Sequence, residues 1–263
     1  MKALDAGWFS RTSVRRMYVC NAGYFDYDMG HMTFGYNMGT PLTVITVFLV
    51  LETESGYVVF DTGWSPNMVP VLESIGLNPR IGPENDVGRY LEELGIGAGE
   101  VRMVVLSHLH LDHAGGLARF KGCRVVVQRD ELNHARGPHP FAAIPYTRLD
   151  WDFPDFEWEA VDGDLMLDKG LALVLLNGHT PGTSGLLVNL PNRGPLLFTG
   201  DNCYLRVNLE NDLIPGSIWE PRQAWHSLRK AKFLAELTGA SLVPSHDREV
   251  YGEKLPLFPE YLD

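Results

Sequence analysis

Four side chains that can bind a metal ion lie close together in the segment SHLHLDHAGG, residues 107–116. They are His108, His110, Asp112 and His113. Imidazole and carboxylate groups are ligands that zinc and related divalent cations prefer. In an extended chain every second side chain points the same way, so His108, His110 and Asp112 would project together. A turn at residues 114–116, where glycine accepts a positive φ, would bring in His113. The spacing therefore predicts a metal site.

Three more metal-capable residues each follow an apolar run elsewhere in the chain. They are His179 in LVLLNGHTPG, Asp201 in PLLFTGDNCY and His246 in SLVPSHD. Each alone is weak evidence, and Asp201 or His246 alone could equally serve in capping or packing. Because all three fall at the ends of separate expected strands, we predict that they complete the coordination of two metal ions.

These motifs, in this order and spacing, resemble the metallo-β-lactamase superfamily of binuclear hydrolases. The resemblance includes FDTG at residues 60–63 and spans residues 61–247. It implies an α+β fold, the αββα four-layer sandwich, in which two mixed β-sheets are flanked by helices. The chain contains no Pro/Ser-rich linker, repeat or low-complexity tract, so a single domain over residues 1–263 is expected.

The resemblance also implies which residues hold each metal ion. The ligands of the first would be His108, His110 and His179, and those of the second Asp112, His113 and His246. Asp201 would bridge the two ions, and Asp61 would orient a ligand imidazole by a hydrogen bond. The expected cofactors are two divalent ions, with Zn(II) first and Mn, Fe or Co as alternatives. The other histidines, expected to be surface or core residues, are His31, His134, His139 and His226.

Tyr204, three residues after Asp201, indicates which branch of the superfamily the sequence resembles. The N-acyl homoserine lactonase branch has a tyrosine at this offset, where its phenol reaches the substrate carbonyl. Asp201 stands where antibiotic-hydrolysing relatives usually have cysteine, and Thr183 stands where glyoxalase-II-like thioesterases have a second histidine. Cys203 is expected to be a small buried residue and not a nucleophile.

The activity implied by this branch is hydrolysis of the lactone ring of N-acyl homoserine lactones, which degrades quorum-sensing signals. Hydroxide held between the two metal ions would attack the lactone carbonyl. Tyr204 would stabilise the oxyanion, and Asp112 would pass a proton to the leaving ring oxygen. Three alternatives stay open: a lactonase or esterase for another substrate, a glyoxalase-II-like thioesterase, and a metal-binding sensor without catalysis.

The elements that must position these residues can be predicted from short apolar runs and turn signals. Strands are expected at residues 16–20, 44–52, 57–61, 103–108, 124–129, 171–176, 185–190 and 195–199, and SLVPSHD at residues 241–247 is expected to be a last strand and its loop. A hairpin turn is expected at residues 54–56, and helices are expected from the N-cap Asp86 to Gly95 and over residues 222–238. Residues 23–41 are expected to form a long loop or flap, and residues 130–165 an irregular segment. This order indicates two packed sheets with helices outside.

The flap and residues 130–160 could together form an apolar cleft for an acyl chain. The aromatic and aliphatic residues of the second segment are Phe141, Ile144, Tyr146, Trp151, Phe153 and Phe156. Packing of these residues onto the sandwich is an equal alternative for any one of them. Apolar residues of the flap could instead serve a homodimer interface.

The composition limits the partners of the chain. Its 263 residues include 22 Lys+Arg and 33 Asp+Glu, a net charge of −11, which argues against binding nucleic acid. Its longest apolar run, residues 42–51, is half the roughly 20 residues that span a bilayer, so no membrane partner is expected. Cys20, Cys123 and Cys203 do not suggest a disulfide framework, and the N-terminal residues lack a signal-peptide pattern. A cytoplasmic protein that acts on a small-molecule lactone is expected.

Overall fold

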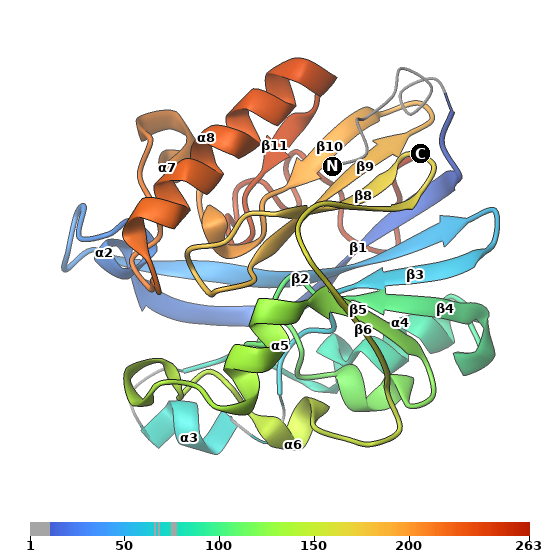
Figure 1. Cartoon of the computed structure of the whole chain (residues 1–263), viewed down its shortest axis with the longest axis horizontal. Helices are drawn as coiled ribbons and strands as arrows, with labels where there is room; N and C mark the ends of the chain where they lie inside the picture. The colour runs from blue at the N-terminus through green and yellow to red at the C-terminus, as the bar shows by residue number, and fades with distance from the viewer. Residues whose placement is uncertain (1–10, 66, 68, 75–77) are drawn as a thin grey trace.

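Two mixed β-sheets face each other across the centre of the molecule (Figure 1). The computed structural model describes residues 11–65, 67, 69–74 and 78–263. The six-stranded sheet has the order β1-β2-β3-β4-β5-β6, antiparallel up to β3 and parallel from β3 onwards. Its strands are β1 (Val14–Asp28), β2 (Pro41–Thr53), β3 (Gly56–Phe60), β4 (Val101–Val105), β5 (Arg124–Gln128) and β6 (Glu157–Val161).

The five-stranded sheet has the order β11-β10-β9-β8-β7, in which only β10 and β11 are parallel. Its strands are β7 (Leu165–Asp168), β8 (Leu171–Leu175), β9 (Ser184–Leu190), β10 (Gly194–Phe198) and β11 (Ser241–Val243). The two mixed sheets flanked by helices confirm the expected αββα sandwich.

Helices cover the outer face of each sheet (Figure 1). The α-helices are α2 (Met29–Met32), α3 (Val69–Ser74), α4 (Val87–Glu93), α5 (Arg129–Arg136), α6 (Arg148–Trp151), α7 (Arg206–Asn211) and α8 (Pro221–Thr238). Apolar residues of α4, α5 and α6 pack under the six-stranded sheet, and α8 packs on the five-stranded sheet through Ala231. The predicted N-cap Asp86 accepts a hydrogen bond from the Gly88 N–H at 2.8 Å, which confirms the start of α4.

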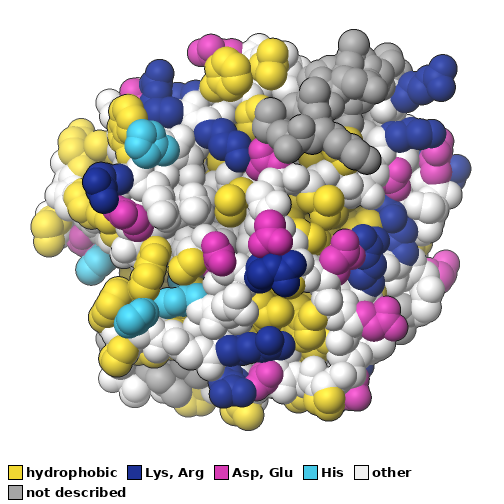
Figure 2. All heavy atoms as spheres, in the orientation of Figure 1, with side chains coloured by type: hydrophobic (Ala, Val, Ile, Leu, Met, Phe, Trp, Pro, Cys, Tyr) yellow, Lys and Arg dark blue, Asp and Glu magenta, His cyan; other side chains and the backbone are white. Residues whose placement is uncertain are grey.

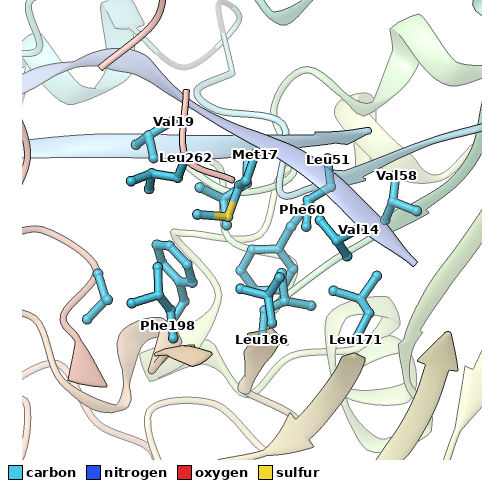
Figure 3. Close-up of a cluster of buried hydrophobic side chains, with 14 of the residues drawn as sticks. Val14, Met17, Val19, Leu51, Val58, Phe60, Leu171, Leu186, Phe198 and Leu262 are labelled. Carbon is cyan, nitrogen blue, oxygen red and sulfur yellow. The ribbon is translucent and has the colours of Figure 1, made fainter. Parts of the chain in front are cut away.

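The main core lies between the two sheets. Figure 3 shows Met17, Leu51 and Phe60 of the six-stranded sheet pointing toward Leu171, Leu186 and Phe198 of the five-stranded sheet. All six side chains are buried, as expected for strands whose inward faces pack against each other. This shared core holds the two sheets in one arrangement, so the loops at their strand ends have defined positions.

The prediction of a loop over residues 23–41 is wrong for residues 23–28, because β1 continues to Asp28. Gly23 indicated a loop, but it occupies an irregularity in the pairing of β1 with β2, where its φ is +126°. A Cβ on Gly23 would lie 2.9 Å from the carbonyl oxygen of Arg80, so the site requires glycine. The short helix α2 and turns follow, and they end at Pro41.

The prediction of an irregular segment over residues 130–165 is also wrong in large part. It contains most of α5, all of α6 and the edge strand β6, which pairs in parallel with β5. The α5 sequence RDELNHAR has few apolar residues, and the acidic Glu131 takes one of its three buried positions. A buried carboxylate hides the apolar periodicity that identifies a helix.

Candidate metal centre

The first predicted cluster follows β4, whose residues are mostly buried. His108 and His110 lie beyond the strand end, and the chain then turns, with the N–H groups of His113 and Ala114 donating to the His110 carbonyl at 3.0 and 2.9 Å. Because of this turn the alternation expected for an extended chain holds for His108 and His110 but not for Asp112.

Gly115 and Gly116 serve close packing and not the positive φ that was predicted. Gly116 has a φ of −90°, and neither glycine has a positive φ. A Cβ on Gly115 would lie 1.9 Å from the backbone nitrogen of Ser65, and one on Gly116 would lie 2.4 Å from the Thr62 carbonyl oxygen. The loop that carries the histidines is therefore pressed against the segment that follows β3.

The other predicted residues follow strands of the five-stranded sheet. His179 comes after β8, Asp201 lies in a short 3₁₀ turn (Gly200–Asn202) after β10, and His246 comes after β11. Gly178 has a φ of +131°, and a Cβ there would lie 2.2 Å from the backbone nitrogen of Ala224 in α8. Close contact with α8 thus fixes the loop that carries His179.

The structure brings all seven predicted residues together in two groups, and the donor atoms within each group lie within 4.8 Å of one another. The first group is His108, His110 and His179; the second is Asp112, His113, Asp201 and His246. Six of the seven are buried and Asp112 is half-buried. Apart from Asp201, the residues fall into the two sets that the resemblance implied, and Asp201, expected to bridge the ions, falls in the second group.

Asp201 lies between the two groups. Its Oδ2 atom is 3.5 Å from His179 Nε2 and 3.8 Å from His108 Nε2. Its Oδ1 atom is 3.3 Å from His113 Nε2 and 3.2 Å from His246 Nε2. Oδ2 also lies 3.4 Å from His246 Nε2, so it is near both groups, whereas Oδ1 contacts the second group. A carboxylate placed between the two groups in this way could bridge two metal ions.

Several of these atoms lie close together but form no hydrogen bond of acceptable geometry with any described residue. They are His108 Nε2, His113 Nε2 and Asp201 Oδ1, and all three are buried. Buried polar atoms are nearly always paired, and leaving one unpaired costs about 1–3 kcal/mol. Imidazole nitrogens and carboxylate oxygens that converge without partners fit divalent metal ions.

Asp61 makes the contact with a histidine that was predicted for it. Its Oδ2 lies 2.8 Å from His113 Nδ1 and accepts a hydrogen bond from the Ser107 hydroxyl, while its Oδ1 accepts from the Ser107 N–H at 2.7 Å. Its backbone has a φ of +60°, a strained conformation that clusters at functional sites. The contact at Nδ1 orients the His113 imidazole so that its Nε2 faces the other residues of the second group.

Tyr204 is buried beside the first group. Its hydroxyl lies 3.0 Å from His179 Nδ1, which also lies 2.7 Å from the Ser217 carbonyl oxygen. A neutral imidazole carries one proton, and donation from Nδ1 to Ser217 leaves the Nε2 lone pair for a metal. The Tyr204 O–H is then left to donate to another acceptor.

A cavity of about 220 Å³ lies over the two groups, and Tyr204, Asp112 and Asp201 contribute to its wall. The rest of its wall is mainly apolar. Phe25, Tyr27 and Met32 line it from the segment predicted as a flap, and Ile144 lines it from the segment predicted as irregular. Trp151, Phe153 and Phe156 pack instead in the core under the six-stranded sheet.

Comparison with known proteins matches residues 41–246 to the family model described as the metallo-beta-lactamase superfamily. The chain belongs to the metallo-beta-lactamase superfamily. N-acyl homoserine lactonase AttM of Azorhizobium caulinodans is 30% identical over 251 residues, which cover 90% of this chain and 94% of that protein. N-acyl homoserine lactonase AiiA of Bacillus thuringiensis subsp. kurstaki is 25% identical over 257 residues, with 95% and 100% covered.

Solved structures of this superfamily share the fold closely. An N-acyl homoserine lactone hydrolase with the product N-hexanoyl-L-homoserine bound at its catalytic metal centre superimposes with a TM-score of 0.86. It is 25% identical, and the match covers 95% of this chain and 100% of that one. The fold and the two His/Asp groups together indicate divalent metal ions in this member of the superfamily.

The electrostatics of the two groups differ. Burial, followed by the neighbouring imidazoles, holds the pKa of His108 and of His110 well below the usual value, so both are neutral. Burial alone would lower the pKa of His113, but the nearby carboxylates, chiefly that of Asp201, outweigh burial and raise it well above its usual value. The carboxylates of the second group therefore favour the charged form of His113, whereas burial favours the neutral form of the imidazoles in the first group.

Two of the histidines without an assigned role lie near the centre. The His134 ring packs edge-on against Trp219 and the His139 ring packs against it at a tilt, with centroids 4.6 and 5.4 Å apart. His134 and Trp219 also line a cavity of about 260 Å³ that touches His110 and His179. His31 and His226 contact Tyr27 and Trp225 and carry no role here.

Sequence reasoning missed Ser217, Trp219 and Glu131, although all three border the centre. Ser217 and Trp219 come from the loop between α7 and α8, which has no motif to mark it. Cys203 is buried as predicted, and burial raises the pKa of its thiol to about 12, so it stays protonated.

Proposed function

We propose that this protein is a metal-dependent N-acyl homoserine lactonase, a hydrolase that opens the lactone ring of quorum-sensing signals. The observation that carries the proposal is the pair of ligand groups that share Asp201 beneath an apolar cavity to which Tyr204 contributes. Relatives that match over most of their length carry this activity in their names, which supports it.

His108, His110 and His179 would hold the first ion, and Asp112, His113 and His246 the second, with Asp201 shared between them. We propose Zn(II) as the native metal, with Mn, Fe and Co as ions that the same ligands accept. When bound, the ions supply Lewis acidity toward the ester carbonyl and lower the pKa of water to about 7.

The residues of the chain itself bind and orient the substrate. The Tyr204 O–H donates to the lactone carbonyl oxygen as that oxygen gains negative charge, which stabilises the transition state more than the ground state. Asp112 lines the same cavity, with its Oδ2 3.4 Å from His113 Nε2. Its carboxylate would take up the proton that the attacking water gives up and pass it to the ring oxygen as the bond between that oxygen and the carbonyl carbon breaks.

The cavity wall suits an acyl homoserine lactone. Phe25, Met32 and Ile144 offer apolar surface to the acyl chain, while the polar groups gather at the end where the lactone must lie. The substrate is uncharged, so the acidic protein, with a net charge of −11, does not repel it.

Two further proposals concern the molecule in its surroundings. Cys20, Cys123 and Cys203 are free thiols, which fits the cytoplasm as a reducing compartment. Phe34, Tyr36 and Met38 are exposed by 54%, 48% and 73%, and they offer a surface for a homodimer. Sedimentation analysis tests the dimer: a monomer at micromolar concentration contradicts it.

A substrate panel tests the activity. N-acyl homoserine lactones of several chain lengths, another lactone, a thioester and an aryl ester are assayed with the same metal-loaded protein. We expect the acyl homoserine lactones to have the highest kcat/KM. A higher kcat/KM for the thioester or the aryl ester would contradict the proposal and favour one of the alternative hydrolases.

A further inference from the structure

Glu131 on α5 is a fully buried carboxylate that no metal group includes. Removing a charged carboxylate from water is unfavourable unless hydrogen bonds replace the lost hydration. The other buried residues of α5 are the apolar Leu132 and Ala135, so the Glu131 carboxylate needs hydrogen-bond donors from outside the helix.

Four donors surround the Glu131 carboxylate. Oε1 accepts from the Leu109 N–H at 2.9 Å and from the Tyr146 hydroxyl at 3.0 Å. Oε2 accepts from the Thr180 hydroxyl at 2.5 Å and from the Gly182 N–H at 3.1 Å. Two of these donors are backbone N–H groups, which can only donate, so the ionised carboxylate satisfies them.

These donors are next to the three histidines of the first group. Leu109 lies between His108 and His110, and Thr180 directly follows His179. One carboxylate oxygen therefore holds the loop after β4, and the other holds the loop after β8. Because the loops come from different sheets, Glu131 sets the separation between the ligands that each loop carries.

Tyr146 connects Glu131 to His110 by a second route. The Tyr146 ring packs edge-on against the His110 imidazole, with centroids 4.7 Å apart and planes at 71°. Its hydroxyl is the group that donates to Glu131. The Glu131 carboxylate thus also fixes the Tyr146 ring, which packs against the His110 imidazole.

The loop that carries His179 packs so closely against α5 that there is no room for a side chain at Gly182. A Cβ on Gly182 would lie 2.5 Å from Glu131 Cβ and 2.8 Å from Gln128 Cβ. Among the described residues, no hydrogen bond links the second group to α5. The buried carboxylate outside the ligand set that contacts this group is Asp61, whose Oδ2 lies 2.8 Å from His113 Nδ1.

We propose that Glu131 is a positioning residue for the first metal ion, acting through the hydrogen bonds that hold the loops of His108, His110 and His179. The inference rests on the proposed metal centre but not on the substrate. It predicts that the two sites can be weakened separately, the first through Glu131 and the second through Asp61.

The test is titration of metal-free protein with Zn(II) against a chelating indicator, with histidine side-chain NMR to show which imidazoles bind. Glu131→Gln keeps the size of the side chain but places an amide donor against groups that donate. We expect the affinity of the first site to fall roughly 10- to 100-fold, as is typical when a group that orients ligands is removed. Asp61→Asn is the matched control, and we expect it to weaken the second site.

Milder variants decide the outcome if Glu131→Gln does not fold. Tyr146→Phe and Thr180→Val each remove one donor, and each should weaken the first site by a smaller factor. Wild-type binding in every variant that folds, or an equal loss of both ions, would overturn the positioning role. A wild-type protein that binds both ions but opens no lactone would instead overturn only the proposed function.

Discussion

At the scale of single residues, the centre depends on side chains that face two partners. The Asp201 carboxylate lies between the two ligand groups, with Oδ2 near His179 and His246 and Oδ1 near His113. His179 presents Nε2 to the centre, while its Nδ1 lies 2.7 Å from the Ser217 carbonyl oxygen. A substitution that keeps the size of such a side chain but changes one of its polar atoms therefore removes one of the two contacts.

Asp201→Asn replaces one carboxylate oxygen with an amide that cannot ligate a metal in the same way. We expect the variant to hold fewer than two ions per chain, because one group loses its shared ligand. Elemental analysis after gel filtration measures the stoichiometry. Retention of both ions would contradict the bridging role.

Tyr204→Phe removes only the phenol oxygen from the cavity. We expect kcat for an acyl homoserine lactone to fall roughly ten- to a thousandfold, which brackets the loss of one oxyanion donor, with metal content unchanged. Cys203→Ala is the neighbouring control, since the buried thiol has no role in the reaction. Unchanged kinetics of Tyr204→Phe would remove the phenol from the mechanism.

At the scale of elements, the loops at strand ends are held by close backbone contacts as well as by hydrogen bonds. Gly115 packs against the backbone of Trp64 and Ser65, and Gly178 packs against the start of α8. The ligand loops are therefore built into the packing of the sandwich and are not free to adapt.

Gly115→Ala tests this packing. The added Cβ would meet backbone atoms at 1.9 and 2.1 Å, so we expect a loss of unfolding free energy of about 1–3 kcal/mol or more. Gly99→Ala is the control, because its Cβ would have no atom within 4 Å. Urea unfolding measures both, and equal stabilities of the two variants would contradict the packing argument.

The local parts of this architecture could be predicted from sequence, and the long-range parts could not. The motif at residues 107–116 and the helix-boundary residues Asp86 and Gly95 act over a few residues, so their spacing is informative. Glu131 could not be recognised, because its four donors come from three separate segments. Gly23 indicated a loop where strand pairing with β2 continues, since pairing depends on distant residues.

At the scale of the whole molecule, the centre joins the two sheets. His108, His110, Asp112 and His113 follow the six-stranded sheet, while His179, Asp201 and His246 follow the five-stranded sheet. On the face shown in Figure 2, Lys and Arg side chains alternate with Asp and Glu and with apolar patches, and no basic surface dominates that view. No helix among the described residues is long and apolar enough to cross a membrane.

Removal of metal should therefore loosen the whole sandwich. Ligands that bind only the folded state stabilise it by several kcal/mol at high saturation, so we expect chelation to lower Tm on the order of 10 °C. Calorimetry with and without chelator measures the shift, and added Zn(II) should reverse it. An unchanged Tm after complete metal removal would contradict a centre that links the sheets.

The central claim is that this chain opens acyl homoserine lactones by means of a two-metal centre. The most direct measurement is hydrolysis of N-hexanoyl-L-homoserine lactone by the same protein sample with metal bound, after chelation, and after Zn(II) is restored, with metal content determined at each step. The account predicts ring opening with two ions per chain, none in the metal-free state, and recovery with metal. Full metal occupancy without ring opening, or equal hydrolysis without metal, would contradict it.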